Sequence, residues 1–145
     1  MAEIVNYVEK AYDELDNYET EDSGSSVSVS VIYFTSNALY FPDDNETARK
    51  RIFEDNRYEY RHYRRKRQAG ENVREIFVRD VRKQWYITGI SRKYGTVDET
   101  AELLKSLTRG TRIITVGTSA CGFAACLFGE MLHASDISAF PDSLI

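Results

Sequence analysis

The feature that most constrains the fold of this chain is residues 112–132, RIITVGTSACGFAACLFGEML. It opens with a β-branched run over residues 113–116, which is typical of a buried strand. A glycine-containing turn over residues 117–122 follows, and a small, apolar run with helical spacing over residues 123–132 completes the unit. A strand, a tight turn and a helix give chemical meaning to a serine in a G-x-S-x pattern, and Ser119 is that serine.

Length and composition limit the remaining choices. A chain of 145 residues with 42% hydrophobic residues fits one domain with a real core, and a formal net charge of −4 disfavours a nucleic-acid partner. We find no apolar run of about 18 or more residues and no signal-peptide pattern, so we expect no membrane span and a cytoplasmic location. Cys121 and Cys126 face different sides of the expected helix, so they should not form a disulfide, and we expect free, buried thiols. The cysteines and the histidines, His62 and His133, lack zinc-site spacing, so we expect no metal and no cofactor.

Helical and strand patterns alternate along the chain. Apolar spacing predicts an amphipathic helix over residues 3–18, and strand patterns cover residues 27–35, 73–78, 112–116 and 137–140. This alternation predicts an α/β fold, with a mostly parallel sheet of about four strands and helices on both faces. The single domain, 1–145, then has an acidic N-terminal helix and linker, 1–22, and a sheet core, 27–145, that contains the unit 112–132.

Two helix starts carry capping signals. Thr96 and Glu99 form the capping-box pattern before an apolar helical face, and Gly110 ends that helix. Earlier in the chain, the turn-forming sequence PDDN at residues 42–45 separates two predicted elements. Asp44 or Asn45 is expected to cap the helix that follows it.

Two charged segments allow more than one interpretation. The first 22 residues are strongly acidic, which fits a solvated outer face better than a docking element. Residues 49–67 are strongly basic with interleaved aromatic residues, a pattern that serves phosphate contact and base stacking in nucleic-acid-binding proteins. Because the whole chain is acidic, we favour a solvated basic helix that pairs with the acidic N-terminal segment across the domain.

Asp80, Trp85 and Tyr86 come shortly after the strand expected over residues 73–78. Side chains at the carboxyl edge of a parallel sheet line ligand clefts, so these three residues are candidate binding residues. Alternatively, Asp80 caps a short helix and Trp85 fills the core. The sequence alone favours this second interpretation.

The turn after the strand 112–116 predicts a set of catalytic groups. Ser119 projects its hydroxyl above the sheet edge, and the backbone N–H of Ala120 lies at the helix N-terminus, where the dipole favours a developing oxyanion. A second oxyanion donor normally comes from the loop after an earlier strand, and Ser36 or Asn37 occupies that place here. We expect the helix to pack against the sheet through a seam of small residues, Gly122, Ala125 and Gly129.

The sequence around Ser119 also resembles a known protein family. VGTSACGFAACLFGEMLHASDISAF resembles the nucleophile-elbow region of α/β-hydrolase-like proteins found in bacterial surface-polysaccharide gene clusters, approximately G-x-S-x-G-G-[YF]-A-A-x-L-[FY]-G. The segment FVRDVRKQWYITGI is similar to another part of the same proteins, so the resemblance covers roughly residues 27–142. It implies the N-terminal half of an α/β-hydrolase fold, Ser119 as nucleophile, and esterase or acyltransferase chemistry on an acylated or saccharide small molecule.

The chain departs from this pattern in two ways. Cys121 stands where the second glycine is expected, so its side chain crowds the point at which strand and helix nearly touch. In hydrolases of this class the acid and the histidine follow the serine. Here His133 lies about 20 Å from Ser119 along the same helix, and His62 precedes the serine in the basic segment. The triad is therefore incomplete, and we expect a truncated protein that is incomplete or inactive on its own.

Two other functions stay open. Gly117-x-Ser119-x-x-Gly122 between a strand and a helix loosely resembles the dinucleotide fingerprint G-x-G-x-x-G, with Asp142 near the position of the ribose-binding acid. A serine, however, replaces the middle glycine. The other alternative is a non-catalytic interaction module, whose exposed edge strand self-associates or binds a second polypeptide that completes the sheet.

Overall fold

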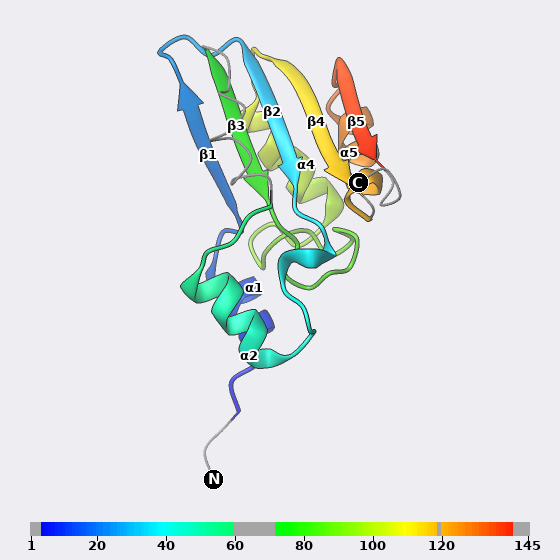
Figure 1. Cartoon of the computed structure of the whole chain (residues 1–145). Coiled ribbons are helices and arrows are strands. Elements are labelled where there is room, and N and C mark those ends of the chain that lie inside the picture. Colours follow the sequence, from blue (N-terminus) through cyan, green and yellow to red (C-terminus); the bar gives the residue numbers. More distant parts are fainter. Residues whose placement is uncertain (1–3, 60–71, 119, 141–145) are drawn as a thin grey trace.

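The computed structural model describes residues 4–59, 72–118 and 120–140, and it shows an α/β fold (Figure 1). A five-stranded mixed sheet runs in the order β1-β3-β2-β4-β5. The strands are β1 (Tyr18–Ser23), β2 (Val29–Phe34), β3 (Val73–Val78), β4 (Arg112–Thr118) and β5 (Asp136–Phe140). The helices are α1 (Tyr7–Glu14), α2 (Asn45–Ala48), α4 (Val97–Leu107) and α5 (Ala120–Met131), with the 3-10 turn η1 (Asn37–Leu39) and the π-helical turn η2 (Arg49–Glu54).

The sheet contains all of the predicted strands, and β2, β3, β4 and β5 are parallel. Ile32, at the centre of β2, pairs with Ile76 of β3 and with Thr115 of β4. The prediction of about four strands is wrong in one respect, because β1 adds a strand antiparallel to β3. Its residues, YETEDS, were expected as a helix end and a linker. They form a strand because an outer edge tolerates acidic side chains, and Asp22 pairs there with Arg74 at 2.8 Å.

Helix α1 is shorter than the helix predicted over residues 3–18. Its N-cap is Asn6, whose side chain accepts a hydrogen bond from the Glu9 N–H at 3.1 Å. After the helix the chain reaches Asn17, which has a left-handed backbone with a φ of 61°. Asn17 is buried and donates a side-chain N–H to the Ile90 carbonyl at 2.8 Å. This long-range contact, which the apolar spacing does not reveal, fixes the turn from α1 into β1.

Helices α4 and α5 cover one face of the sheet and form the main core with it (Figure 1). In this core the rings of Phe34 and Phe128 stack with their centres 5.4 Å apart. The opposite face holds a separate cluster, in which Tyr58 packs against Tyr33 and Phe77. Helices α1 and α2 lie beyond the carboxyl ends of the parallel strands (Figure 1). The expected covering by helices on both faces is therefore not met by the helices of the described residues, since α4 and α5 share a face.

Small residues bring α5 close to the sheet, as predicted. At Gly129 a Cβ atom would lie 2.6 Å from Ile137 Cδ1, so a larger residue fits only if the neighbour moves. Thr115 donates its hydroxyl to the carbonyl of Ala125 at 2.8 Å, and Ala125 is fully buried. At Gly122 a Cβ atom would lie 3.5 Å from its nearest neighbour, which is an ordinary contact.

The predicted capping signals are confirmed. Thr96 Oγ1 accepts the N–H of Glu99 at 3.0 Å at the start of α4, and Asp44 accepts the N–H of Thr47 at 2.7 Å at the start of α2. Cys126 is a free thiol, as expected, but it is exposed rather than buried because it lies on the side of α5 that faces away from the sheet. Among the described residues, we find no helix whose length and apolar character would let it cross a membrane.

A second, smaller core lies beyond the carboxyl ends of the sheet. We call this region the cap and define it as α1, η1, α2, η2 and residues 79–95. Its buried apolar side chains come from all of these elements: Ala11, Tyr12, Leu39, Tyr40, Ala48, Ile52 and Val81. The Tyr12 hydroxyl donates to the Thr88 carbonyl at 2.8 Å, which ties α1 to the loop after β3.

The pairing that we expected between the acidic segment 1–22 and the basic segment 49–67 stays a prediction, because residues 60–67 lie outside the described residues; among the described ones, Asn56 of the basic segment donates to Glu19 Oε1 at 2.8 Å. Glu9 of α1 binds Arg82 of the loop after β3, with a shortest N–O distance of 2.6 Å. In the basic segment, Arg51 binds Asp55 of the same segment at 2.9 Å. The later part of the segment lies outside the described residues. The acidic helix is therefore fastened to the loop after β3, beside the carboxyl edge of the sheet.

Candidate functional site

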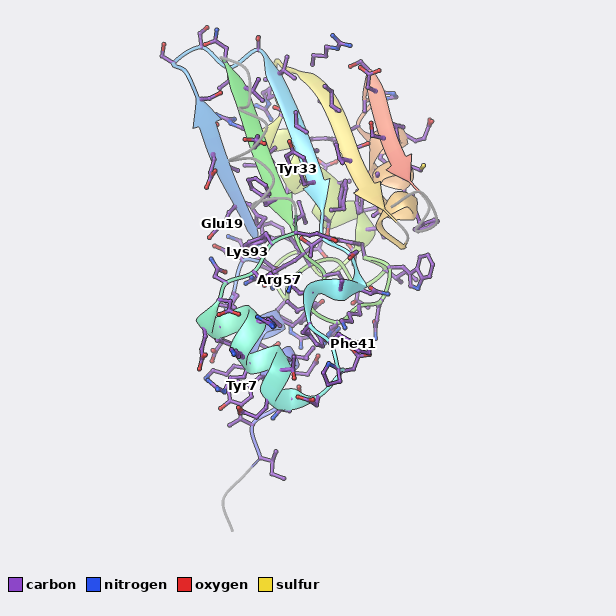
Figure 2. The ribbon with its side chains drawn as sticks, viewed as in Figure 1. Tyr7, Glu19, Tyr33, Phe41, Arg57 and Lys93 are labelled. Atoms are coloured by element: carbon purple, nitrogen blue, oxygen red, sulfur yellow. The ribbon has the colours of Figure 1, made fainter. Side chains whose placement is uncertain are left out.

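The carboxyl edge of the sheet has a topological switch point between β2 and β4. The connection that leaves β2 reaches the face on which Tyr58 packs against Tyr33 and Phe77 (Tyr33 is labelled in Figure 2). The connection that leaves β4 is α5, which covers the opposite face. Neighbouring strands whose connections leave to opposite faces open a crevice outside their carboxyl ends, and ligands of open α/β sheets bind in such crevices. The sheet edge outside the carboxyl ends of β2 and β4, which we call the crevice, is thus the candidate site.

The β4–α5 unit forms one side of this crevice. β4 ends at Thr118 and α5 begins at Ala120, so a single residue joins the strand to the helix. The predicted strand–turn–helix arrangement is confirmed, while Ser119 itself lies outside the described residues. The first N–H groups of a helix have no acceptor within the helix, and the positive end of its dipole lies there. The Ala120 N–H therefore lies at the turn, and its role as an oxyanion donor stays a prediction.

The loop after β2 forms the other side of the crevice. The Thr35 N–H donates to the Val78 carbonyl of β3 at 2.8 Å. Successive N–H groups of an extended chain point to opposite sides, so the N–H of Ser36 is directed to the side of β4. The Ser36 N–H donates to Glu59 Oε2 at 2.6 Å. The Ser36 N–H, in the loop predicted to supply a second oxyanion donor, is therefore bound to a carboxylate of the same chain.

The side chains of Ser36 and Asn37 have other surroundings. The Ser36 hydroxyl accepts the Ala38 N–H at 3.2 Å and caps η1, which begins at Asn37. Asn37 is exposed. The donor that this loop offers to the crevice is consequently the backbone of Ser36.

Asp80 organises the loop after β3. Its carboxylate accepts backbone N–H groups of Arg82, Gln84 and Tyr86 at 3.0, 2.7 and 2.9 Å. Burial raises the pKa of Asp80, and the backbone N–H groups act in the opposite direction. Trp85 and Tyr86 have left-handed φ angles of 58° and 63°, which cost roughly 1–2 kcal/mol each in side-chain-bearing residues. The buried carboxylate therefore holds a strained loop in place.

Tyr86 and Trp85 end in different environments. Tyr86 belongs to the main core, and its hydroxyl donates toward the Thr35 carbonyl at 3.1 Å. Trp85 is 49% exposed, and its ring meets that of Phe123, near the start of α5, edge to face at 5.9 Å. Asp80 thus anchors a loop rather than a short helix, and Tyr86 rather than Trp85 fills the core. Of the three candidate binding residues, Trp85 presents its ring at the surface beside α5.

The remaining sequence candidates lie elsewhere. His133 is exposed and follows the C-terminal end of α5, opposite the β4–α5 turn, as we expected. His62, Asp142 and the side chain of Cys121 lie outside the described residues. Within the described ranges, no group of His, Cys, Asp and Glu side chains is arranged to hold a metal ion.

Glu59 is a residue beside the Ser36 loop that sequence reasoning missed. It lies in the basic segment 49–67, which we expected to form a solvated helix. Its contact with Ser36 spans 23 positions and depends on where the connection from β2 passes the sheet edge. Neither periodicity nor a short motif signals such a contact.

Comparisons with known proteins found no relative of this chain. The chain matches no protein-family model, no curated protein and no solved structure. Inference about function therefore proceeds from the switch point and from the groups that line it.

Proposed function

We propose that this chain is an α/β-hydrolase-like protein of the serine esterase and acyltransferase class, related to surface-polysaccharide biosynthesis. One observation carries the proposal: the parallel pairing of β2 and β4 brings the loop at Ser36 and the β4–α5 turn to the same edge of the sheet. Serine hydrolases of this class need a nucleophile on a strand–turn–helix unit and a donor from the loop after an earlier strand. The resemblance over roughly residues 27–142 supports the same assignment.

The chemistry that such a crevice supports is attack on an ester carbonyl. The Ser119 oxygen bonds to the carbonyl carbon, and the carbonyl oxygen becomes an oxyanion that the Ala120 N–H stabilises, joined by the Ser36 N–H when Glu59 releases it. The C–O bond to the leaving alcohol then breaks, and that alcohol takes a proton. A general base must first accept the serine proton. Since His133, the histidine of the described residues, lies at the far end of α5, we expect the chain alone to turn over esters slowly.

The surface beside the turn suits a substrate with an apolar part. Trp85 and Phe123 are each 49% exposed and lie next to each other. Ligand sites combine such apolar and aromatic surface with a few polar groups that fix orientation. An acylated or saccharide small molecule offers both an apolar face for these rings and a carbonyl for the crevice.

A fluorophosphonate probe tests the proposal. We expect slow labelling that mass spectrometry maps to Ser119, because oxyanion donors and binding alone retain roughly 10³–10⁴-fold of catalysis when a triad is incomplete. The label should disappear in Ser119→Ala and persist in Ser106→Ala, whose serine lies on α4 and donates to the Leu103 carbonyl. Labelling spread over other serines, or unchanged in Ser119→Ala, would contradict the function. Rapid, stoichiometric labelling of Ser119 would contradict the slow turnover of the chain alone.

A further inference from the structure

The two edge strands of the described sheet differ in charge. β1 carries Glu19, Glu21 and Asp22, and charged side chains commonly protect an edge strand from pairing with another chain. β5, at the opposite edge, has the sequence DISAF (Figure 1). Its one charged residue, Asp136, is bound by Arg112 of β4 at 2.7 Å. The β5 edge therefore lacks the protection that β1 has.

The backbone of β5 presents hydrogen-bonding groups at this edge. The Ser135 N–H donates to the Ile113 carbonyl of β4 at 2.9 Å. Successive residues of a strand direct their N–H and C=O groups to opposite sides, so Asp136, Ser138 and Phe140 direct theirs away from β4. Among the described strands, none pairs with this side of β5. Donors and acceptors are thus available for a further strand.

The helix beside this edge has an apolar outer surface. α5 has a single charged residue, Glu130, and it exposes Phe123 and Cys126. Helices that are apolar around their whole circumference are typically buried. On the same face of the sheet, α4 exposes charged side chains to solvent: Asp98, Glu99, Glu102 and Lys105. The outer surface of α5 is therefore suited to contact with protein rather than with water.

Cys126 borders the open edge at the level of the middle of β5. Residues three and four positions apart share a side of a helix, so Cys126 lies between Gly122 and Gly129 on one side of α5. A Cβ atom on Gly122 would lie 3.5 Å from Ala139, and one on Gly129 would lie 2.6 Å from Ile137. Since Ala139 and Ile137 flank Ser138 on β5, Cys126 lies at the level of Ser138.

A second copy of this chain fits the edge in an antiparallel register with a twofold axis at Ser138. This register pairs all of the residues that point outward, because Asp136 lies opposite the partner's Phe140 and Ser138 lies opposite the partner's Ser138. The Asp136 carboxylates of the two copies are then separated by four residues, or roughly 14 Å along the strands. An axis at Asp136 would instead place these like charges directly opposite each other, which is unfavourable.

The same pairing brings the two copies of α5 to packing distance. α5 lies over both β4 and β5, since a Cβ atom on Gly129 would approach Thr115 as well as Ile137. Its axis is therefore about one strand spacing, about 4.8 Å, from the twofold axis, which separates the two helices by about 9.6 Å. Helices in direct contact are roughly 8–10 Å apart. A second copy thus covers the strand edge and the apolar helix surface together.

We propose that two copies of this chain associate through β5, antiparallel about a twofold axis at Ser138, with α5 of one copy packed against α5 of the other. The sheet continues across the axis, and Cys126 faces the partner's Cys126. One strand edge and one helix side make a small interface, so we expect a dissociation constant on the order of 10 µM. This association does not depend on the proposed hydrolase function.

Sedimentation velocity at about 1 and 200 µM protein tests the association. We expect the mass of the wild type to rise with concentration from 16.7 kDa towards twice that value. Ser138→Pro removes an outward N–H and leaves the ladder with β4 intact, so it should stay at the mass of a single copy. Ser138→Ala keeps the backbone groups and should associate as the wild type does. Circular dichroism shows whether each variant is folded.

Variants of α5 test the helix contact independently of the strand. Cys126 is exposed in a single copy, so Cys126→Lys leaves the fold intact and places two positive charges against each other at the axis. We expect its association to weaken at least tenfold, whereas Ser106→Lys, at an exposed position of α4, should have no effect. A short bis-maleimide should link two copies of Cys121→Ser through Cys126 and should fail to link Cys126→Ser.

Three results would overturn the proposal. The first is a wild type that keeps the mass of a single copy at about 200 µM. The second is association that persists in Cys126→Lys or in folded Ser138→Pro, because the copies would then meet through another surface. The third is cross-linking that persists in Cys126→Ser. If Ser138→Pro does not fold, Cys126→Lys and the cross-linking decide the outcome.

Discussion

The main core under α4 and α5 and the border between the sheet and the cap are stabilised by different kinds of contact. In the main core, the stacked rings of Phe34 and Phe128 and the close approach at Gly129 set the spacing of helix and sheet. At the border, buried polar groups hold the backbone. Arg79 is 1% exposed and donates to Asn17 Oδ1 at 3.0 Å, and Asp80 binds the loop that follows it. The packing of helix and sheet thus depends on apolar contacts, whereas the geometry of the candidate site depends on individual polar contacts.

The largest expected change in stability is that of Asp80→Ala, which removes a buried acceptor at the border between the sheet and the cap. The substitution leaves the N–H groups of Arg82, Gln84 and Tyr86 without their buried acceptor, in a loop with left-handed residues. We expect a loss of about 3 kcal/mol in the free energy of unfolding, measured by urea denaturation. The emission of Trp85 should change as well, because the same loop holds its ring against Phe123.

An exposed acid on a regular helix is the control for this prediction. Asp98 lies in the first turn of α4 and is exposed, so Asp98→Ala should change stability by no more than about 0.5 kcal/mol. If Asp80→Ala were as mild as this control, the polar contacts at the border would not hold the loop. The contrast between the two regions would then fail.

The next effect tests the apolar core with two substitutions in one helix. In Gly129→Ala the new Cβ atom meets Ile137 Cδ1 and Thr115 Oγ1 at 2.6 and 2.9 Å, so we expect a loss of about 2 kcal/mol. In Gly122→Ala the contacts are ordinary and alanine favours the helix, so stability should stay within about 0.5 kcal/mol or rise. Thermal or urea unfolding measures both. Equal costs at the two positions would show that the approach of α5 to the sheet is not limited at Gly129.

Sequence reasoning located the elements whose residues are apolar for structural reasons. Runs rich in valine and isoleucine marked the parallel strands, and the small residues at Gly122, Ala125 and Gly129 marked the face that α5 turns to the sheet. It missed β1, because the strand is an acidic outer edge with little apolar spacing to detect. It extended α1 too far, because a buried contact of Asn17 turns the chain away.

The site was less accessible to sequence reasoning, for a related reason. The strand–turn–helix unit around Ser119 and the loop at Ser36 lie at strand ends, and strand ends can be placed once the strands are known. The roles of Glu59 and Asp80 depend on where single polar atoms meet in space, and the exposure of Trp85 depends on a left-handed backbone. Such contacts leave no periodic pattern in the sequence.

The smallest expected effect is a change of stability with pH that arises from Tyr40 in the interior of the cap. Burial raises the pKa of Tyr40 to about 12, and the carboxylates of Asp43 and Asp80 act in the same direction. The pKa in the unfolded chain is close to the ordinary value of 10.0. Because the folded-state pKa is the higher one, the neutral phenol contributes its full stability below about pH 10. That contribution is lost as the pH rises from about 10 towards 12, by about 1.4 kcal/mol at pH 11.

Tyr40→Phe isolates this contribution. Tyr40 also donates its hydroxyl to the Val81 carbonyl at 2.7 Å, so the wild type should be the more stable protein at pH 8. Urea denaturation of both proteins at pH 8 and pH 11 should show this advantage shrinking by about 1.4 kcal/mol, since all other titrating groups are common to the two. A difference that does not change with pH would mean that the Tyr40 hydroxyl is as well solvated in the folded cap as in the unfolded chain. The cap would then lack a closed interior of its own, and its order would depend on the polar contacts at the border alone.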